Sequence, residues 1–106
     1  MTSEPYALEL TRDAVKDLKR LRPWTEQATR AIARLEENPS LGHPLSGSLK
    51  GTRSLEFSLK GSGVYRADYV VFENRRVCLV LIIGPHENIY DKAQRRVSAL
   101  RRSGQI

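Results

Sequence analysis

The chain has little that would stabilise it through covalent cross-links or metal ions. It contains one cysteine, Cys78, and two histidines, so no disulfide can form within it and no metal-ligand spacing is present. Its longest apolar run, residues 77–83, is far too short to cross a membrane. The N-terminal residues show no apolar signal region. We therefore expect a cytoplasmic protein that binds no membrane and needs no metal or cofactor.

Negative charge is also scarce. The sequence has 18 Lys and Arg against 12 Asp and Glu, a net charge of +6. Such an excess in a small domain indicates a polyanionic partner, which net charge alone does not identify as RNA, DNA or an acidic protein. A basic surface kept for solubility is the alternative. At 40% hydrophobic and 28% charged residues, the composition predicts one folded domain over residues 1–106 rather than a disordered chain.

The N-terminal half predicts a strand followed by two amphipathic helices. Residues 6–10 alternate apolar and polar side chains, as in a short strand. Thr11 is a suitable cap for a first helix, which Arg22-Pro23 interrupts. A second helix follows from Trp24 and ends at Asn38-Pro39. The next segment, residues 40–50, is rich in Gly, Pro and Ser and predicts a loop.

The C-terminal half predicts a three-stranded antiparallel meander and a last helix. The strands cover residues 54–59, 64–72 and 76–83, and the helix begins near Glu87. The third strand is apolar on both faces, as a central strand would be. The order strand, helix hairpin, meander and C-terminal helix indicates an α+β fold with the helix pair on one face of the sheet.

Side-chain alternation assigns the two faces of the meander. The face toward the helix pair is expected to carry Leu55, Phe57, Leu59, Tyr65, Ala67 and Tyr69, together with Cys78, Val80 and Ile82 of the third strand. The opposite face is expected to carry Glu56, Ser58, Arg66 and Asp68, together with Leu79, Leu81 and Ile83. The apolar part of this second face must be covered, either by Ile89, Ala93, Val97 and Leu100 of the last helix or by a partner.

Three polar residues are candidates for phosphodiester chemistry. If residues 74–75 form a two-residue turn, Arg66 lies opposite Ile83 and its side chain extends toward His86. His86 and Tyr90 are four residues apart, on one side of the expected helix. Arg can bind a phosphate, His can move a proton near neutral pH, and Tyr can position a base. RNA supplies its own nucleophile, the 2′-hydroxyl, so this chemistry needs no metal.

Each of these residues also has a structural interpretation. Arg66 can pair with Glu56 or Asp68, His86 can cap the last helix, and Tyr90 can belong to the core. Cys78, in the middle of the apolar third strand, is interpreted as a small core residue rather than a reactive thiol.

Three short segments resemble the RelE/ParE toxin superfamily, and within it the RelE-like mRNA interferases. These segments are Pro44-Leu45-Ser46-Gly47, Val64-Tyr65-Arg66-Ala67-Asp68-Tyr69 and the stretch 82–90 that ends in His86 and Tyr90. The element order is similar over nearly the whole chain. The resemblance implies a type II toxin neutralised by a cognate acidic antitoxin, and in the RelE branch it implies cleavage of mRNA on the ribosome. Alone, such a toxin is expected to be a monomer, and with its antitoxin a heteromer.

The resemblance also assigns roles to individual residues. Arg66 matches the strand arginine that contacts the scissile phosphate, His86 falls where family members have Arg or His, and Tyr90 matches the C-terminal tyrosine. Some RelE members have two lysines on the first meander strand, where this chain has Glu56 and Ser58. This departure leaves open whether Glu56 or His86 is the general base. It also suggests that missing positive charge comes from other residues, namely Lys50, Arg53 and Lys60.

The last helix is strongly basic, with Lys92, Arg95, Arg96, Arg101 and Arg102 and no acidic residue after Asp91. We expect it to dock onto ribosomal RNA phosphates, the alternative being a solvated helix face. Two other functions remain open from the sequence. One is a ParE-type inhibitor of DNA gyrase without nuclease activity, and the other is a degenerate toxin that only binds its antitoxin.

Overall fold

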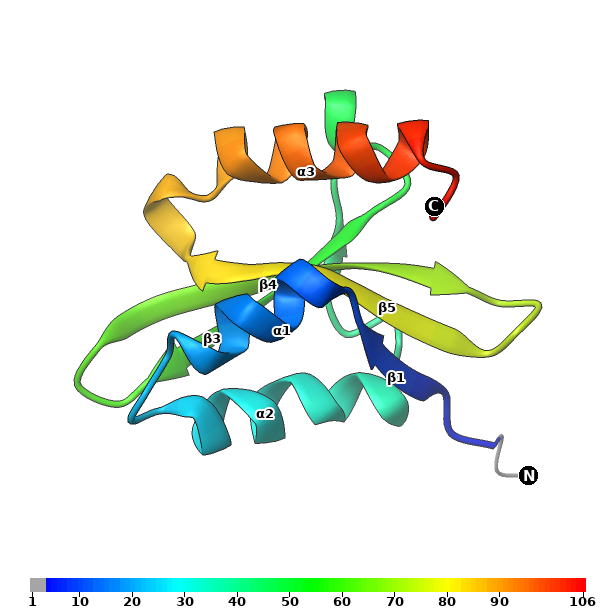
Figure 1. Ribbon diagram of the computed structural model, residues 1–106. Coiled ribbons are helices and arrows are strands. Elements are labelled where there is room, and N and C mark those ends of the chain that lie inside the picture. Colours follow the sequence, from blue (N-terminus) through cyan, green and yellow to red (C-terminus); the bar gives the residue numbers. More distant parts are fainter. Residues whose placement is uncertain (1–3) are drawn as a thin grey trace.

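A five-stranded sheet lies between helices in the computed structural model, which describes residues 4–106. The sheet order is β1-β5-β4-β3-β2, and the strands are β1 (Ala7–Leu10), β2 (His43–Pro44), β3 (Arg53–Leu59), β4 (Gly63–Phe72) and β5 (Val77–Pro85). The helices are α1 (Arg12–Lys19), α2 (Thr25–Ala33) and α3 (Tyr90–Arg102), with 3-10 turns η1 (Arg34–Glu36), η2 (Gly47–Leu49) and η3 (His86–Asn88). Helix α3 lies on the opposite side of the sheet from α2 (Figure 1). The predicted α+β fold is confirmed.

One edge of the sheet is β1, which confirms the strand predicted over residues 6–10, and the other edge contains elements that the sequence does not reveal. Strand β1 pairs in parallel with the start of β5, and the two-residue strand β2 pairs with the start of β3. Both β2 and η2 fall in the segment predicted as a loop. Elements of two or three residues have no measurable periodicity, so the prediction could not have included them.

A β-bulge in β5 changes the predicted register. Pairing follows the predicted turn from Phe72–Val77 to Tyr69–Val80, but Asp68 then pairs with Ile82, which leaves Leu81 without a partner. A bulge of this kind displaces all later pairs by one residue. The prediction that Arg66 lies opposite Ile83 is therefore wrong, because Arg66 lies opposite Gly84. The shift brings Arg66 one residue closer along the ladder to His86.

The same bulge reverses two predicted side-chain directions. Ile82 was assigned to the helix pair, but it packs in the cluster beneath α3, and Ile83 packs on the side of the helix pair. The remaining assignments hold. Leu55, Phe57, Leu59, Ala67 and Tyr69 are buried with α1 and α2, and Ile89, Ala93 and Val97 cover the other face. Cys78 is fully buried in the first cluster, and this burial raises the pKa of its thiol.

The start of α1 lies where the sequence predicts it, whereas the start of α3 does not. Thr11 caps α1 as expected, since its hydroxyl oxygen accepts a hydrogen bond from the Ala14 amide at 3.1 Å. Helix α3, in contrast, begins at Tyr90 and not near Glu87, because the chain first makes the 3-10 turn η3 after the extended Pro85. His86 and Tyr90 therefore do not share one α-helix, and the helical-spacing argument that placed them side by side does not apply.

Candidate active site

An acid–imidazole pair lies at the end of the sheet where β5 gives way to η3. His86 Nδ1 is 2.8 Å from Glu56 Oε2, and both side chains are nearly half exposed. Glu56 stands on β3 directly opposite Arg66 on β4. Sheet geometry, a bulge and a 3-10 turn thus bring together residues that are 30 positions apart in the sequence. The pair joins the two residues between which the sequence left the role of general base open.

A hollow of about 600 Å³ opens beside this pair. Its walls are formed by Glu56, Ser62, Gly63, Val64 and the segment Pro85 to Asn88. One wall is the β3–β4 hairpin and the other is η3, so the hollow is open to a ligand that crosses the end of the sheet. Arg66 does not line it, although its neighbour Glu56 does. Tyr90 does not line it either, and its exposure of 49% rules out a place in the core.

Arg66 is held by a buried carboxylate. Its Nη2 donates to Asp68 Oδ2 at 2.8 Å, and Arg66 and Asp68 are 8% and 0% exposed. Three buried polar atoms around this pair have no hydrogen-bond partner: Arg66 Nε, Asp68 Oδ1 and Ser54 Oγ. Ser54 and Asp68 are cross-strand neighbours. Of the two pairings considered for Arg66, the one with Asp68 is present. The Nε donor of Arg66 is therefore unused, but it is buried.

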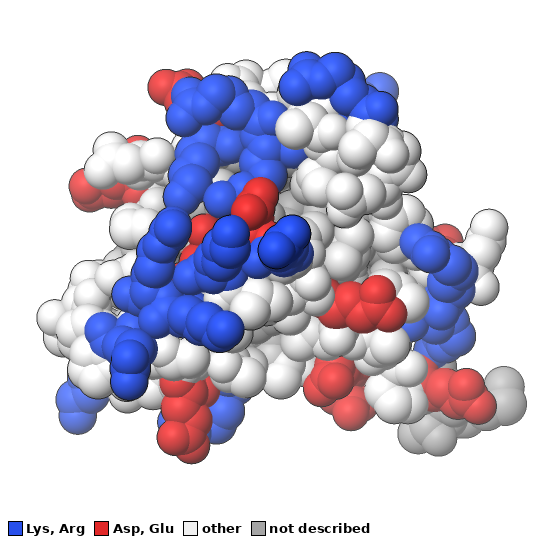
Figure 2. Space-filling view, in the orientation of Figure 1, with Lys and Arg blue, Asp and Glu red and all other residues white. Residues whose placement is uncertain are grey.

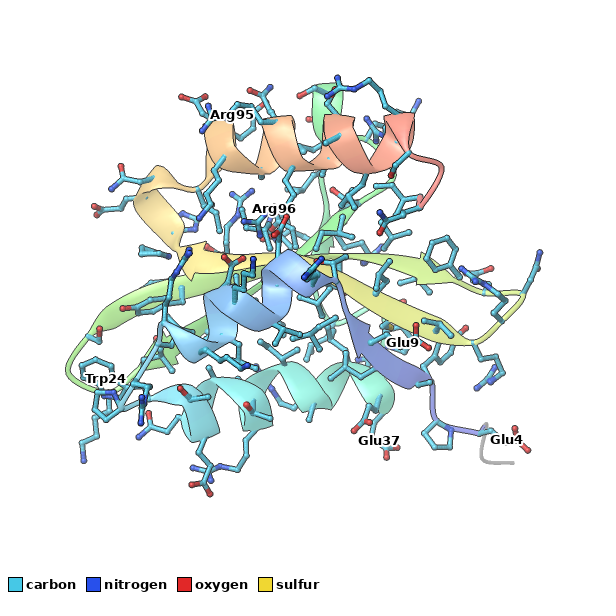
Figure 3. The ribbon with its side chains drawn as sticks, viewed as in Figure 1. Glu4, Glu9, Trp24, Glu37, Arg95 and Arg96 are labelled. Carbon is cyan, nitrogen blue, oxygen red and sulfur yellow. The ribbon has the colours of Figure 1, made fainter. Side chains whose placement is uncertain are left out.

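The six basic residues predicted to bind RNA fall into two groups. Arg53 and Arg96 are engaged inside the fold: Arg53 donates to the carbonyls of Ser40 and Gly42, and Arg96 donates to Asp17. The other residues are exposed, namely Lys50, Lys60, Lys92 and Arg95. Figure 3 shows Arg96 pointing from α3 toward the sheet, whereas Arg95 points away from it. Exposure leaves the four residues of the second group accessible to a polyanion, and their role in RNA binding stays a prediction.

The chain is similar to known bacterial toxins. A family model described as the ParE-like toxin of type II bacterial toxin–antitoxin systems matches residues 8–94. The chain belongs to this family. The predicted membership of the RelE/ParE superfamily is confirmed, and the protein is a toxin of the type II toxin–antitoxin class. No curated protein matches the toxin.

Solved structures extend the likeness to RelE toxins. A mutant of the E. coli toxin RelE in the free state is 25% identical to this toxin, with a TM-score of 0.67 over 88% of this chain and 98% of that chain. A chain of the RelBE2 toxin–antitoxin complex from Mycobacterium tuberculosis is 26% identical, with a TM-score of 0.66 over 79% of this chain and 94% of that chain. A mutant of E. coli RelE in complex with an antitoxin RelBc peptide is 26% identical, with a TM-score of 0.63 over 84% and 94% of the two chains.

The sequence analysis of the toxin missed one buried acid, Asp17 of α1. Its side chain is 2% exposed, its Oδ2 accepts from the Ile83 amide at 3.0 Å, and it pairs with Arg96 of α3. Asp17 therefore provides the hydrogen-bond acceptor for a β5 amide beyond the end of β1, and its ion pair with Arg96 connects α1 to α3. A signal was present, because Asp17 follows the buried Ala14 by three residues, on the same face of α1. A carboxylate on an apolar face predicts a buried partner.

The described part of the toxin, residues 4–106, contains no helix that is both long enough and apolar enough to span a membrane.

Proposed function

We propose that the toxin is a ribosome-dependent mRNA endonuclease that inhibits translation. The observation that supports this most is the 2.8 Å pair of Glu56 and His86, which faces an open hollow and stands beside Arg66 in the sheet. Two groups able to carry protons and one fixed cation are what metal-independent cleavage of RNA requires. The structural likeness to RelE toxins is consistent with this activity.

The proposed reaction uses the 2′-hydroxyl of RNA as the nucleophile. Its oxygen attacks the adjacent phosphorus, the bond to the 5′-oxygen breaks, and the products are a 2′,3′-cyclic phosphate and a 5′-hydroxyl. One proton leaves the 2′-hydroxyl and one is delivered to the 5′-oxygen. Nδ1 of His86 lies 2.8 Å from Glu56 Oε2, so Nε2 is the imidazole atom that exchanges a proton with RNA, and Glu56 carries out the other proton transfer.

Arg66 and Tyr90 complete the proposed site. Arg66, anchored on Asp68, is 8% exposed and does not line the hollow of the free toxin, so its role of stabilising the extra negative charge of the phosphorane requires the toxin to change when RNA binds. Tyr90, half exposed at the start of α3, positions a base or the nucleophile. Since Tyr90 does not line the hollow in the free toxin, this role requires bound RNA to extend from the hollow to the start of α3.

Mapping of 5′ ends after induction tests the proposal. Translation-dependent cuts within reading frames are expected for the wild-type toxin, with loss of the cuts in His86→Ala and Arg66→Ala. Ser58→Ala is the control, because Ser58 is an exposed residue of β3 outside the hollow. Intact mRNA after induction of a growth-arresting wild-type toxin contradicts the proposal.

Gyrase inhibition is the second candidate, and the match to a ParE-like family model favours it. In a supercoiling assay with purified gyrase, inhibition that survives His86→Ala identifies this activity and excludes the nuclease as its cause. Harmless overproduction of the wild-type chain identifies instead a degenerate toxin that only binds an antitoxin.

The proposed partners are the ribosome with its mRNA and a cognate acidic antitoxin. Three of the similar structures are complexes of RelE-type toxins with RelB-type antitoxins or their peptides. The net charge of +6 complements an acidic antitoxin segment, which we expect to lie over the basic surface and block Arg66. Co-production with the small acidic protein of the adjacent reading frame is expected to restore growth and to give a heteromer on gel filtration, whereas a toxin that stays monomeric contradicts this assignment.

A further inference from the structure

A second hollow, of about 390 Å³, lies between the end of α1 and η3. We call it the α1–η3 hollow. Its apolar walls include Leu21, Tyr65 and Ile89, and its polar rim includes Arg20, Asn88 and Lys92. The volume lies within the range of small-molecule sites, about 300–1,000 Å³. Apolar walls with a few polar groups at the rim are typical of such sites.

The rim of this hollow carries unused positive charge. Asp17 lies at its base, but this carboxylate is already bonded to Arg96 and to the Ile83 amide. Arg20 and Lys92 approach Asp17 only to 3.9 and 3.8 Å, longer than a hydrogen bond. Their side chains are 69% and 46% exposed, so both keep their donors for a ligand. Figure 2 shows Lys and Arg side chains gathered over this part of the surface.

The α1–η3 hollow adjoins the hollow of Glu56 and His86. Pro85 and Asn88 line both of them, so the two hollows share a wall at the end of β5 and η3. Tyr65, which faces the α1–η3 hollow, pairs with Pro85, and the next pair along the sheet is Arg66 with Gly84. A polymeric substrate that reacts at Glu56 and His86 and continues across η3 therefore enters this second hollow.

We infer that the α1–η3 hollow binds the nucleotide that adjoins the cleaved bond of single-stranded RNA. Arg20 and Lys92 bind its phosphate, its base lies against the apolar wall with the Tyr65 ring, and the Asn88 amide contacts the base edge. This inference rests on the proposed nuclease function. It makes Arg20 and Lys92 binding residues for the substrate, and Asn88 a residue that affects which base is preferred.

RNA fits this hollow better than an acidic peptide segment does. A peptide carboxylate would satisfy the two cations, but it would leave the flat ring of Tyr65 and the amide of Asn88 without a matching group. A nucleotide supplies a phosphate, an apolar face and a polar edge in one unit. The position next to the candidate active site also favours an occupant that is continuous with the substrate.

A cycle of RNA and protein changes tests the inference. A set of mRNAs is prepared, each with a single uncharged methylphosphonate at one of the positions that flank the cleaved bond. Ribosomes are programmed with each mRNA, and single-turnover cleavage by the toxin is measured. At one adjoining position the neutral linkage is expected to slow the wild-type toxin about ten- to a hundredfold, the effect of losing hydrogen bonds to charged groups. Arg20→Gln/Lys92→Gln is expected to slow cleavage similarly, with no further loss on the modified RNA.

A matched control separates this contact from general charge effects. Arg30→Gln/Arg34→Gln removes the same charge from α2 and η1, at residues that do not line the hollow, and is expected to keep the full methylphosphonate effect. Circular dichroism checks that both variants are folded. If the effect of the modified linkage is equally large in Arg20→Gln/Lys92→Gln, the inference is wrong.

The outcome stays decisive if the wild-type toxin cleaves nothing, which by itself contradicts only the proposed nuclease. A short single-stranded RNA with one 2′-deoxy sugar, at the nucleotide whose 2′-hydroxyl would attack, is then titrated into the toxin and followed by NMR. Chemical-shift changes centred on Tyr65, Asn88 and Ile89 support the subsite. Changes produced there by a polyglutamate peptide but not by the RNA overturn it, as does the absence of changes with either.

Discussion

At the scale of single residues, two carboxylates on neighbouring strands have opposite environments. Asp68 is fully buried against Arg66, while Glu56 is 43% exposed beside His86. Removing one partner from a buried ion pair leaves an uncompensated charge, whereas an exposed pair contributes little to stability. Asp68 therefore stabilises the fold and holds Arg66, whereas Glu56 is placed to face the substrate.

Asp68→Ala is expected to lower the free energy of unfolding by about 3–5 kcal/mol, because Arg66 stays buried without its partner. Glu56→Gln is expected to change it by less than about 1 kcal/mol and to reduce RNA cleavage strongly. Urea denaturation measures the first effect and single-turnover cleavage the second. Equal stability of the two variants would show that Asp68 does not anchor Arg66.

Cys78 gives a prediction that depends on pH. Burial raises the pKa of its thiol, so the folded toxin keeps the thiol neutral at pH values where the unfolded chain, with a pKa of about 8.5, ionises. Stability is therefore expected to fall as the pH rises above that value, and Cys78→Ala is expected to lose this dependence. A thiol reagent such as dithionitrobenzoate should react only after denaturation; rapid reaction with the folded toxin would contradict the burial.

At the scale of elements, three groups make hydrogen bonds with the backbone of β5 where β1 ends and no longer pairs with it. The Thr11 amide donates to Val80 O at 3.0 Å, Arg96 donates to the carbonyl of the bulged Leu81 at 3.1 Å, and Asp17 accepts from the Ile83 amide. A bulge leaves backbone groups outside the ladder, and α1 and α3 supply their partners. The position of α3 over the sheet therefore depends on polar contacts as well as on its apolar face.

Adjacent arginines of α3 make this dependence measurable. Arg96→Gln is expected to destabilise the toxin by about 2–4 kcal/mol because Asp17 loses its buried partner, while Arg95→Gln is expected to be neutral. Thermal unfolding of the two variants gives the comparison, and both remove one positive charge. If Arg95→Gln lowers the melting temperature as much as Arg96→Gln, the contact with Asp17 is not what secures α3.

The long elements of the fold were predictable from the sequence, but the bulge in β5 was not. Periodicity predicted α1, α2 and the three long strands, and the motifs singled out Arg66 and His86. The bulge at Leu81 was not predictable because residues 77–83 are apolar on both faces, so alternation carries no information about where the register shifts. The pairing of Glu56 with His86 depends on that shift and on η3, so the sequence alone could not predict it.

At the scale of the whole molecule, the distribution of charge differs from the one expected. The basic C-terminal helix was predicted to dock onto ribosomal RNA, but Arg96 is engaged with Asp17, and Arg101 donates to the carbonyls of Ser48 and Lys50. One group of exposed cations lies on α1 and the turn after it, next to the start of α3 (Figure 2). They are Arg12, Lys16, Lys19, Arg20, Arg22, Lys92 and Arg95.

This arrangement moves the proposed ribosome contact from α3 to a surface shared by α1 and the first turns of α3. Each phosphate contact that is lost is expected to reduce the slope of log affinity against log salt by about 0.7–0.9. Arg12→Gln/Lys16→Gln/Lys19→Gln should therefore weaken ribosome association and reduce the magnitude of this slope by up to about 2–3.

The control variant Arg30→Gln/Arg34→Gln, on the far side of the helix pair, should leave the slope unchanged. Because none of the three α1 residues lines either hollow, the single-turnover rate on saturated ribosomes should stay as in the wild type. Equal slopes for the two variants would mean that the toxin meets the ribosome through its overall charge and not through this face.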